Sequence, residues 1–343
     1  MRKFYRILLL VIIGLSILYL LGPKPVTPSY TDALPAVPPG AAALEQYVQA
    51  NESVHRLKPN NEARIVWYND TLRQPTEYAI VYLHGFSASQ EEGNPTHRDI
   101  ARQFGANLYL ARLYDHGIDT SDALVNYSPE GLWESARQAY AIGKQLGKKV
   151  ILMGTSTGGS VALQLAATYP DIAGLVLISP NIAINDPNAW MLNNHWGKQI
   201  ARLVIGSDYR TVSDSRPIYQ QYWNYTYRIE AIVALQEYLE TAMVPATFNK
   251  VLQPVLTLAY YKNEQEQDPV VKISAMRDMF SALGTPAGQK KFVEMKGTGD
   301  HVQGSPIKSK DVEGVKKAIA DFLQTVMQIA PADSTVSNPV SLS

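Results

Sequence analysis

The 343-residue chain contains no cysteine. This absence excludes disulfide bonds, zinc sites built on thiolates, a catalytic cysteine and the lipid-bearing cysteine of a bacterial lipoprotein. The sequence also lacks histidine and acidic clusters with the spacing of metal ligands, and it has no glycine-rich phosphate loop. We therefore expect no metal site and no cofactor.

A net charge is missing as well, because 31 lysines and arginines balance 31 aspartates and glutamates. Proteins that bind nucleic acids carry a basic surface that matches the phosphate backbone, and polybasic surfaces attract anionic lipids. We therefore expect no nucleic-acid partner, and the sequence singles out no protein partner. With 46% hydrophobic residues, the chain can bury a large core, and one main domain is expected.

A long apolar run lies at the N-terminus. It covers residues 7–22 and follows the basic residues Arg2, Lys3 and Arg6. As a helix it would be ~24 Å long at ~1.5 Å per residue, and no small-x-small cleavage site follows it directly. We interpret residues 1–22 as an uncleaved membrane anchor with a cytoplasmic basic end, which places the rest of the chain outside the cytoplasm, in the periplasm or extracellular space. A cleaved signal peptide, and hence a secreted protein, is the alternative.

Composition divides the remaining chain into three parts. Residues 23–43 hold six prolines among small residues, and we interpret them as an extended linker or stalk. Residues 44–330 form the predicted domain. Within it, an insertion over about residues 181–250 is rich in tryptophan and tyrosine and shows helix-like stretches without an obvious strand. The polar tail, residues 331–343, is predicted to be disordered.

Inside the predicted domain, short β-rich runs alternate with longer stretches of helical periodicity. This alternation predicts an α/β fold with a mostly parallel sheet covered by helices. The expected strands are 64–68, 78–83, 108–112, 149–153, 174–179, 255–261 and 291–295. Apolar spacing of three and four predicts helices over 129–146, 160–167 and 310–329.

The strongest chemical signal is the motif Gly154-Thr155-Ser156-Thr157-Gly158, which lies between a predicted strand and a helix-like stretch. Strand, sharp turn and helix are the setting of a nucleophile elbow. A serine held in such a strained turn needs small residues two positions to either side, and Gly154 and Gly158 supply them. The start of the following helix also directs backbone N–H groups toward developing negative charge. We therefore predict that Ser156 is a nucleophile.

The elbow, the sequence His84-Gly85-Phe86 after a strand, and a downstream aspartate and histidine in that order together resemble the α/β-hydrolase superfamily. The resemblance is strongest to its esterases and monoacylglycerol-lipase-like members and covers residues 60–330. It implies the α/β-hydrolase fold, serine hydrolase activity and, over residues 181–250, a helical cap above the active site.

The resemblance also implies partners for the nucleophile. A serine hydroxyl needs a base that takes its proton and later donates it to the leaving group. His301 lies just after the last predicted strand, where the family has this base. Asp268 follows the penultimate strand, where the family has the acid that orients the histidine. Glu264 and Glu266 in the same loop compete for this role, and helix capping by Asp268 is the non-catalytic alternative.

Two backbone groups complete the implied site. In the family pattern, the N–H two residues past the loop histidine, here that of Phe86, joins the N–H of Thr157 to hold the oxyanion. We expect His84, and likewise His116 in Asp115-His116-Gly117, to brace their loops rather than to react.

These expectations describe an enzyme that cleaves carboxylic esters through an acyl-enzyme on Ser156. The membrane segment favours a lipid-like ester substrate, such as a lysophospholipid or a monoacylglycerol, and the cap aromatics either line its pocket or only pack the cap. The same residues serve acyltransferases, thioesterases, amidases and peptidases, because the fold leaves the acyl acceptor open. A membrane-tethered binding protein without catalysis is the alternative from a different class.

Overall fold

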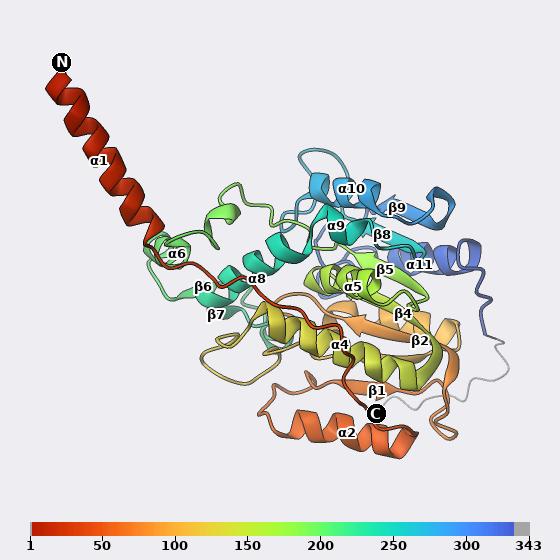
Figure 1. Ribbon diagram of the computed structural model, residues 1–343. Helices are drawn as coiled ribbons and strands as arrows, with labels where there is room; N and C mark the ends of the chain where they lie inside the picture. Colours follow the sequence, from red (N-terminus) through yellow and green to blue (C-terminus); the bar gives the residue numbers. More distant parts are fainter. Residues whose placement is uncertain (1, 333–343) are drawn as a thin grey trace.

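The computed structural model describes residues 2–332, and its centre is a seven-stranded sheet with helices on both faces (Figure 1). The strands are β1 (Arg64–Val66), β2 (Thr76–Leu83), β3 (Asn107–Leu110), β4 (Gly147–Thr155), β5 (Gly174–Ile178), β8 (Val255–Ala259) and β9 (Lys290–Glu294). They lie in the order β1-β3-β2-β4-β5-β8-β9. β1 is antiparallel to β3, and all other neighbours are parallel. The predicted fold class is confirmed.

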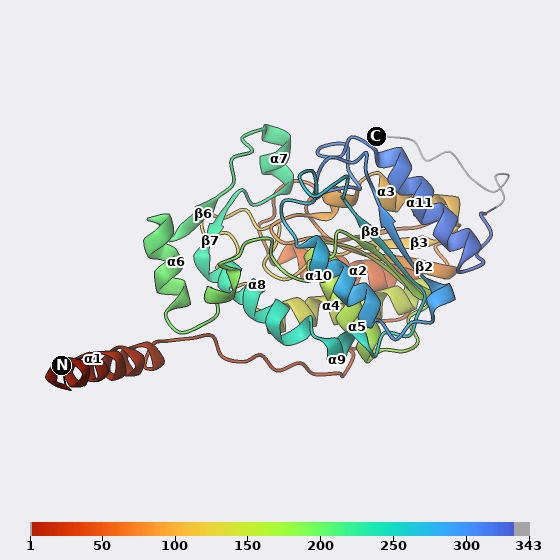
Figure 2. The same ribbon diagram turned by 90° about the horizontal axis from the view of Figure 1, so that it is seen from above.

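The two faces of the sheet pack on different helices (Figure 2). Alternate residues of a strand point to opposite faces, so in β2 Val81 belongs to one core and Ile80 to the other. Both cores exclude solvent, as is typical of parallel sheets. Helices with residues in the first core include α2 (Ala41–Ser53), α4 (Pro129–Leu146), α5 (Thr157–Thr168) and α10 (Ile273–Ala282). Those in the second core are α3 (Thr96–Gln103) and α11 (Val312–Thr325).

Local capping explains why α4 has the bounds that the sequence predicts. The Ser128 hydroxyl accepts the N–H of Gly131 at 3.1 Å, and Pro129 occupies the first helical turn. Proline is favoured at that position because its ring presets the backbone angle and its missing N–H is not needed there.

The insertion between β5 and β8 differs from the expectation in one respect. It contains the helices α6 (Gly197–Ile205), α7 (Pro217–Tyr222), α8 (Ile229–Ala242) and α9 (Pro245–Phe248). It also contains an antiparallel pair, β6 (Tyr209–Thr211) and β7 (Thr226–Arg228). The expectation of an insertion without strands is therefore wrong. Strands of three residues are too short to show a recognisable periodicity, and their pairing is non-local.

The proline-rich segment is extended but does not stand free as a stalk. Thr31 and Asp32 accept hydrogen bonds through their carbonyl oxygens, at 2.8 Å from Trp133 Nε1 and 2.9 Å from the Tyr169 hydroxyl. The Tyr30 hydroxyl lies 3.0 Å from Thr241 Oγ1 on α8. The segment ends where α2 begins, inside the predicted range 23–43. Its apolar side chains pack on the domain, which explains why it lies along the surface.

Helix α1 (Arg2–Leu20) extends away from the body of the molecule in both views (Figures 1 and 2). It has 19 residues, a mean hydropathy of 2.0 and no buried residue, so by length and composition it is a candidate membrane segment. Of the predicted disordered tail, residues 333–343 lie outside the described residues. The division into anchor, linker, domain and tail stays a prediction.

Candidate active site

Ser156 occupies the sharp turn between β4 and α5. Its backbone has φ 54° and ψ −120°, a conformation that few residues other than glycine adopt. Two backbone hydrogen bonds hold the turn, from Ser156 N–H to the Ile178 carbonyl at 2.9 Å and from Asn181 N–H to the Ser156 carbonyl at 3.0 Å. A Cβ atom on Gly158 would collide with the Leu83 carbonyl, and one on Gly154 with the Gly158 carbonyl. The glycines of the motif are therefore required by close backbone packing.

Asp268 and His301 meet beside this turn. The His301 Nδ1 atom lies 2.7 Å from Asp268 Oδ2, and both side chains are buried. The other carboxylate oxygen, Oδ1, accepts the N–H groups of Val270 at 2.9 Å and Val271 at 3.1 Å. Burial opposes the charged imidazolium, but the charge and hydrogen bond of Asp268 outweigh burial and raise the pKa of His301.

The competing acids point elsewhere. Glu264 accepts the Tyr261 hydroxyl at 2.7 Å, and Glu266 pairs with Lys262 at 2.5 Å. Asp300, which precedes His301, pairs with the Lys308 ammonium at 3.3 Å. Helix capping does not explain Asp268 either, because the cap residue of α10 is Lys272.

The end of β5 ties the loops of the nucleophile and the histidine together. The hydroxyl of Ser179, the residue after β5, donates to the His301 carbonyl at 2.9 Å. The Gln303 amide donates in turn to the Ser179 hydroxyl at 2.7 Å. Since Ser156 bonds to the last residue of β5, neighbouring strand ends position both side chains. The sequence does not reveal Ser179 or Gln303, because their bonds join residues more than a hundred positions apart.

The loop after β2 contains a backbone N–H without a hydrogen-bond partner in the described part of the chain. Gly85 donates its N–H to Glu92 Oε2 at 2.5 Å, and Ser87 donates to His116 Nε2 at 3.0 Å. Within residues 2–332, the N–H groups of Phe86 and Thr157 have no hydrogen-bond partner. Free N–H groups are what an oxyanion hole requires.

His84 and His116 brace this loop. His84 Nδ1 donates to the Gly85 carbonyl at 2.9 Å, and its Nε2 accepts the Leu113 N–H at 3.0 Å. His116 Nδ1 donates to the Tyr114 carbonyl at 2.8 Å. Burial lowers the pKa of both histidines, that of His116 to about 4, so they are neutral at physiological pH.

Glu92 is a polar residue at the site that sequence reasoning missed. It is buried, and burial raises the pKa of its carboxyl to about 7. A Cβ atom on Gly85 would lie 2.9 Å from both of its carboxylate oxygens and 3.0 Å from Ser156 Cβ. Gly85 therefore lies between the Glu92 carboxylate and Ser156, and a larger residue would not fit there. Nothing in the sequence marks it, since the adjacent pair Glu91-Glu92 is typical of an exposed loop.

Comparison with known proteins places the chain in a family. The alpha/beta hydrolase family matches over residues 80–313, more than half of the chain. The chain belongs to the alpha/beta hydrolase family. The predicted resemblance is thereby confirmed.

The individual relatives of this hydrolase share less than a third of its residues in the aligned regions. The thermostable monoacylglycerol lipase of Bacillus sp. (strain H-257) is 29% identical over 131 residues, which cover 38% of this chain and 50% of the relative. The match thus spans half of that relative's length. A structure for the metagenome-derived lipolytic enzymes LipS and LipT has a TM-score of 0.58 at 16% identity, over 78% of this chain and 99% of the other. The structure of Paleococcus ferrophilus monoacylglycerol lipase has a TM-score of 0.55 at 17% identity, over 76% of this chain and 97% of the lipase. At such identities the structures show a shared fold alone.

Cap aromatics cover the site of the hydrolase. The Phe86 ring makes edge-to-face contacts, with ring centroids 5.2 Å apart in each case, with Tyr127 and with Tyr227 of β7. Tyr219 and Trp223 of the cap stack at 4.9 Å and pack against Val302, next to His301. The exposed fractions of Ser156 and His301 are accordingly only 5% and 6%. The loops of Phe86 and His301 therefore pack against aromatic side chains of the cap.

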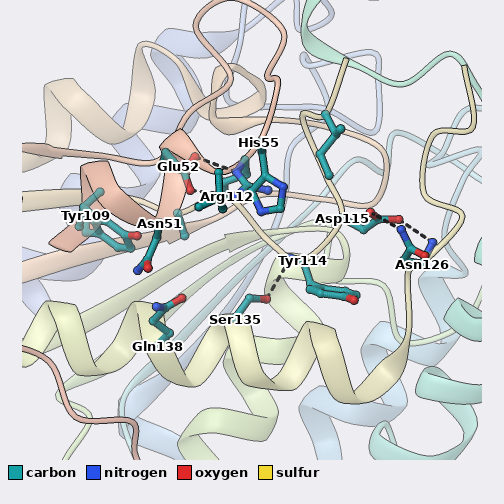
Figure 3. Close-up of a pocket in the computed structure, with 14 residues that line it drawn as sticks. Asn51, Glu52, His55, Tyr109, Arg112, Tyr114, Asp115, Asn126, Ser135 and Gln138 are labelled. Carbon is teal, nitrogen blue, oxygen red and sulfur yellow. Dashed lines mark hydrogen bonds and ion pairs between the residues drawn. The ribbon is translucent and has the colours of Figure 1, made fainter. Parts of the chain in front are cut away.

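A cavity of about 440 Å³ lies apart from this site, between α2 and α4 (Figure 3). Several of its polar groups are paired with one another. Arg112 Nε lies 2.7 Å from Glu52 Oε2, and Asp115 accepts the Asn126 N–H at 2.8 Å. Within residues 2–332, no group of three or more histidine and acidic side chains is arranged to hold a metal ion.

Proposed function

We propose that the chain is a serine hydrolase that cleaves carboxylic esters, with Ser156 as nucleophile, His301 as base and Asp268 as the acid that orients it. The observation that carries this proposal is the buried 2.7 Å contact between His301 and Asp268 beside the strained Ser156 turn. With Nδ1 donating to Asp268, Nε2 of His301 is left to accept a proton.

The reaction follows from these positions. Ser156 Oγ forms a bond to the ester carbonyl carbon while its proton moves to His301 Nε2. The N–H groups of Phe86 and Thr157 hold the oxyanion of the tetrahedral intermediate. When the intermediate collapses, the alcohol leaves with the proton from His301. Water then attacks the acyl-enzyme in the same way and releases the acid and free Ser156.

We infer a lipid-like ester as substrate, such as a monoacylglycerol or a lysophospholipid. Three observations support this class. The apolar helix α1 is long enough to hold the enzyme at a bilayer. Aromatic rings of Tyr127 and Tyr227 pack on Phe86, whose N–H we assign to the oxyanion hole. The Bacillus relative is named a monoacylglycerol lipase.

We also propose that α1 anchors the hydrolase with its domain outside the cytoplasm, in the periplasm or extracellular space. Three basic residues begin α1, and such residues favour the cytoplasmic side. Release of the domain by signal cleavage is the alternative. Protease digestion of intact spheroplasts should degrade the domain if the anchored orientation is correct, and complete protection of the domain would contradict it.

A fluorophosphonate probe tests the enzyme proposal directly. The probe should label the full chain in detergent and should fail to label a Ser156→Ala variant of equal stability. Thr155→Ser, a change one position earlier in the elbow, is the matched control and should still be labelled. Folded wild type that neither takes the label nor cleaves p-nitrophenyl esters of any chain length would favour the binding-protein alternative.

A further inference from the structure

The cap carries an apolar surface that the rest of residues 2–332 leaves largely exposed. It consists of Ile200, Leu203 and Val204 on α6, with exposed side-chain fractions of 38%, 82% and 80%. Spacing of three and four residues puts these side chains on one side of the helix, which we call the α6 face. Soluble proteins rarely leave clustered aliphatic side chains so exposed, and such patches usually mark an interaction site.

The opposite side of α6 is fixed to the cap. Ala201 is buried against Ile229 and Val233 of α8. Arg202 pairs with Asp208 at 2.9 Å and with Glu230. The helix is therefore held in one orientation, and the α6 face points outward because its other side is already packed.

Helix α1 ends against the start of α6. The Trp196 N–H donates to the Pro23 carbonyl at 2.9 Å, and its indole Nε1 donates to the Leu18 carbonyl at 3.1 Å. His195 Nδ1 donates to the Gly22 carbonyl at 2.7 Å. An apolar groove of about 430 Å³ lies between the two helices, and its lining includes Leu15, Leu18, Tyr19, Ile200 and Leu203.

The relative directions of α1 and α6 indicate what could cover the α6 face. In Figures 1 and 2, α1 points away from the body, and α6 lies across the end of α1 on the side of the body that faces it. A bilayer spanned by α1 would thus have its surface at the level of α6. Tyr19 and Trp196 lie at this level, and tyrosine and tryptophan are enriched at membrane–water interfaces.

We propose that the α6 face docks on the same lipid bilayer that α1 spans. This inference rests on the proposed anchoring of α1. Helices that lie in the plane of a membrane insert their apolar side among the upper acyl chains, and α6 has this two-sided character. The groove between α1 and α6 then holds part of a lipid acyl chain. Docking keeps the cap at the bilayer surface, where lipid-like esters are found.

The absence of cysteine allows a direct test, because each introduced cysteine is the only thiol in the full chain. Leu203→Cys, Leu10→Cys and Val54→Cys are each labelled with an environment-sensitive fluorophore and reconstituted into phosphatidylethanolamine–phosphatidylglycerol vesicles. Lipids with a quencher near the headgroup or deep in the acyl chain report the depth of each label. Val54 is the control, since it is 75% exposed and lies at the end of α2, far from α1 (Figure 1).

We expect shallow quenching of the label at Leu203 to be several-fold stronger than at Val54, and deep quenching to be strongest at Leu10. Strong quenching at Leu10 together with equal quenching at Leu203 and Val54 overturns docking and leaves anchoring intact. No quenching at Leu10 overturns anchoring instead. If Leu203→Cys resists lipid quenching and forms disulfide-linked dimers in the vesicles, a second copy covers the α6 face and the proposal is wrong. Fluorophosphonate labelling of each variant verifies its fold.

Discussion

Ser156 lies between two loop regions that each bring a buried carboxylate to the site. On the histidine side, Asp268 accepts two backbone N–H groups and the His301 imidazole. On the side of the loop after β2, Glu92 accepts one N–H, that of Gly85, and burial raises its pKa to about 7. Burial alone therefore does not decide the role of a carboxylate. The number of donors that face it, and whether a base is among them, determines its role.

The largest effect should come from the histidine side. Asp268→Asn should lower kcat by ~10⁴, because the amide leaves His301 in the wrong tautomer and cannot stabilise the imidazolium. Glu264→Gln and Glu266→Gln are the matched controls and should retain nearly full activity, since both side chains point away from His301. The measurement is kcat and KM for a p-nitrophenyl ester. Similar losses in all three variants would show that the acid is assigned wrongly.

Glu92→Gln should act on stability instead. In the wild type, Glu92 keeps its proton up to about pH 7, whereas the unfolded chain loses it near the usual pKa of 4.5. The folded state thus binds more protons over this interval, and the free energy of unfolding falls as pH rises from 4.5 to 7. The decrease due to Glu92 is on the order of 3 kcal/mol.

The neutral amide removes this decrease. The free energy of unfolding of Glu92→Gln should therefore rise relative to that of the wild type as pH rises from 5 to 8. Urea unfolding at several pH values measures the difference. Glu91→Gln, one residue earlier, is the control and should follow the wild type. If Glu92→Gln and the wild type show the same pH dependence, burial does not raise the pKa of Glu92 in the folded state.

A smaller loss is expected where side chains support the histidine loop. Ser179→Ala removes the donor to the His301 carbonyl and leaves the buried Gln303 amide without its closest partner. Loss of such a buried bond costs about 1–3 kcal/mol of unfolding free energy. Ser281→Ala, at an exposed position of α10, is the control and should change stability by less than about 0.5 kcal/mol. An equal effect of both changes would argue that the Ser179 contact does not hold the loop.

The smallest effect is a shift in pH dependence. Activity needs neutral His301, so kcat/KM should fall as pH drops through the pKa of that residue. Because Asp268 raises this pKa, the half-maximal point should lie above 6.5, the usual value for histidine. In Asp268→Asn the residual activity should persist to lower pH. If the kcat/KM of the wild type is half-maximal at or below pH 6.5, Asp268 does not stabilise the imidazolium.

Local patterns allowed much of the fold and the candidate site to be predicted. The elbow motif is contiguous, and each of its glycines meets a nearby backbone atom, so five residues suffice to indicate it. The roles of Asp268 and His301 were implied by the resemblance to the α/β-hydrolase superfamily, which has its acid and base after two strands that here are parallel neighbours, β8 and β9. The bounds of α4 depended on Ser128 and Pro129, which are local signals.

Other features depend on contacts between distant parts of the chain, and the sequence contains no local sign of them. The strands β6 and β7 form their ladder only with each other, and the proline-rich segment lies along the domain because Tyr30 and its neighbours find apolar partners there. Glu92 lies in a segment with the composition of an exposed loop and becomes a buried acid only when β2 and α7 pack against that segment.

By itself, therefore, the sequence determined the chemistry available, namely a strained serine, a histidine, an aspartate and an apolar N-terminal helix, because each depends on neighbouring residues or on strand order. The tertiary structure alone decided which acid contacts His301, which carboxyl near Ser156 has its pKa raised, and which apolar surface lies next to α1. The burial of a side chain, which shifts its pKa, arises only when remote segments pack together. The same packing decides which face of a helix is covered and which stays exposed.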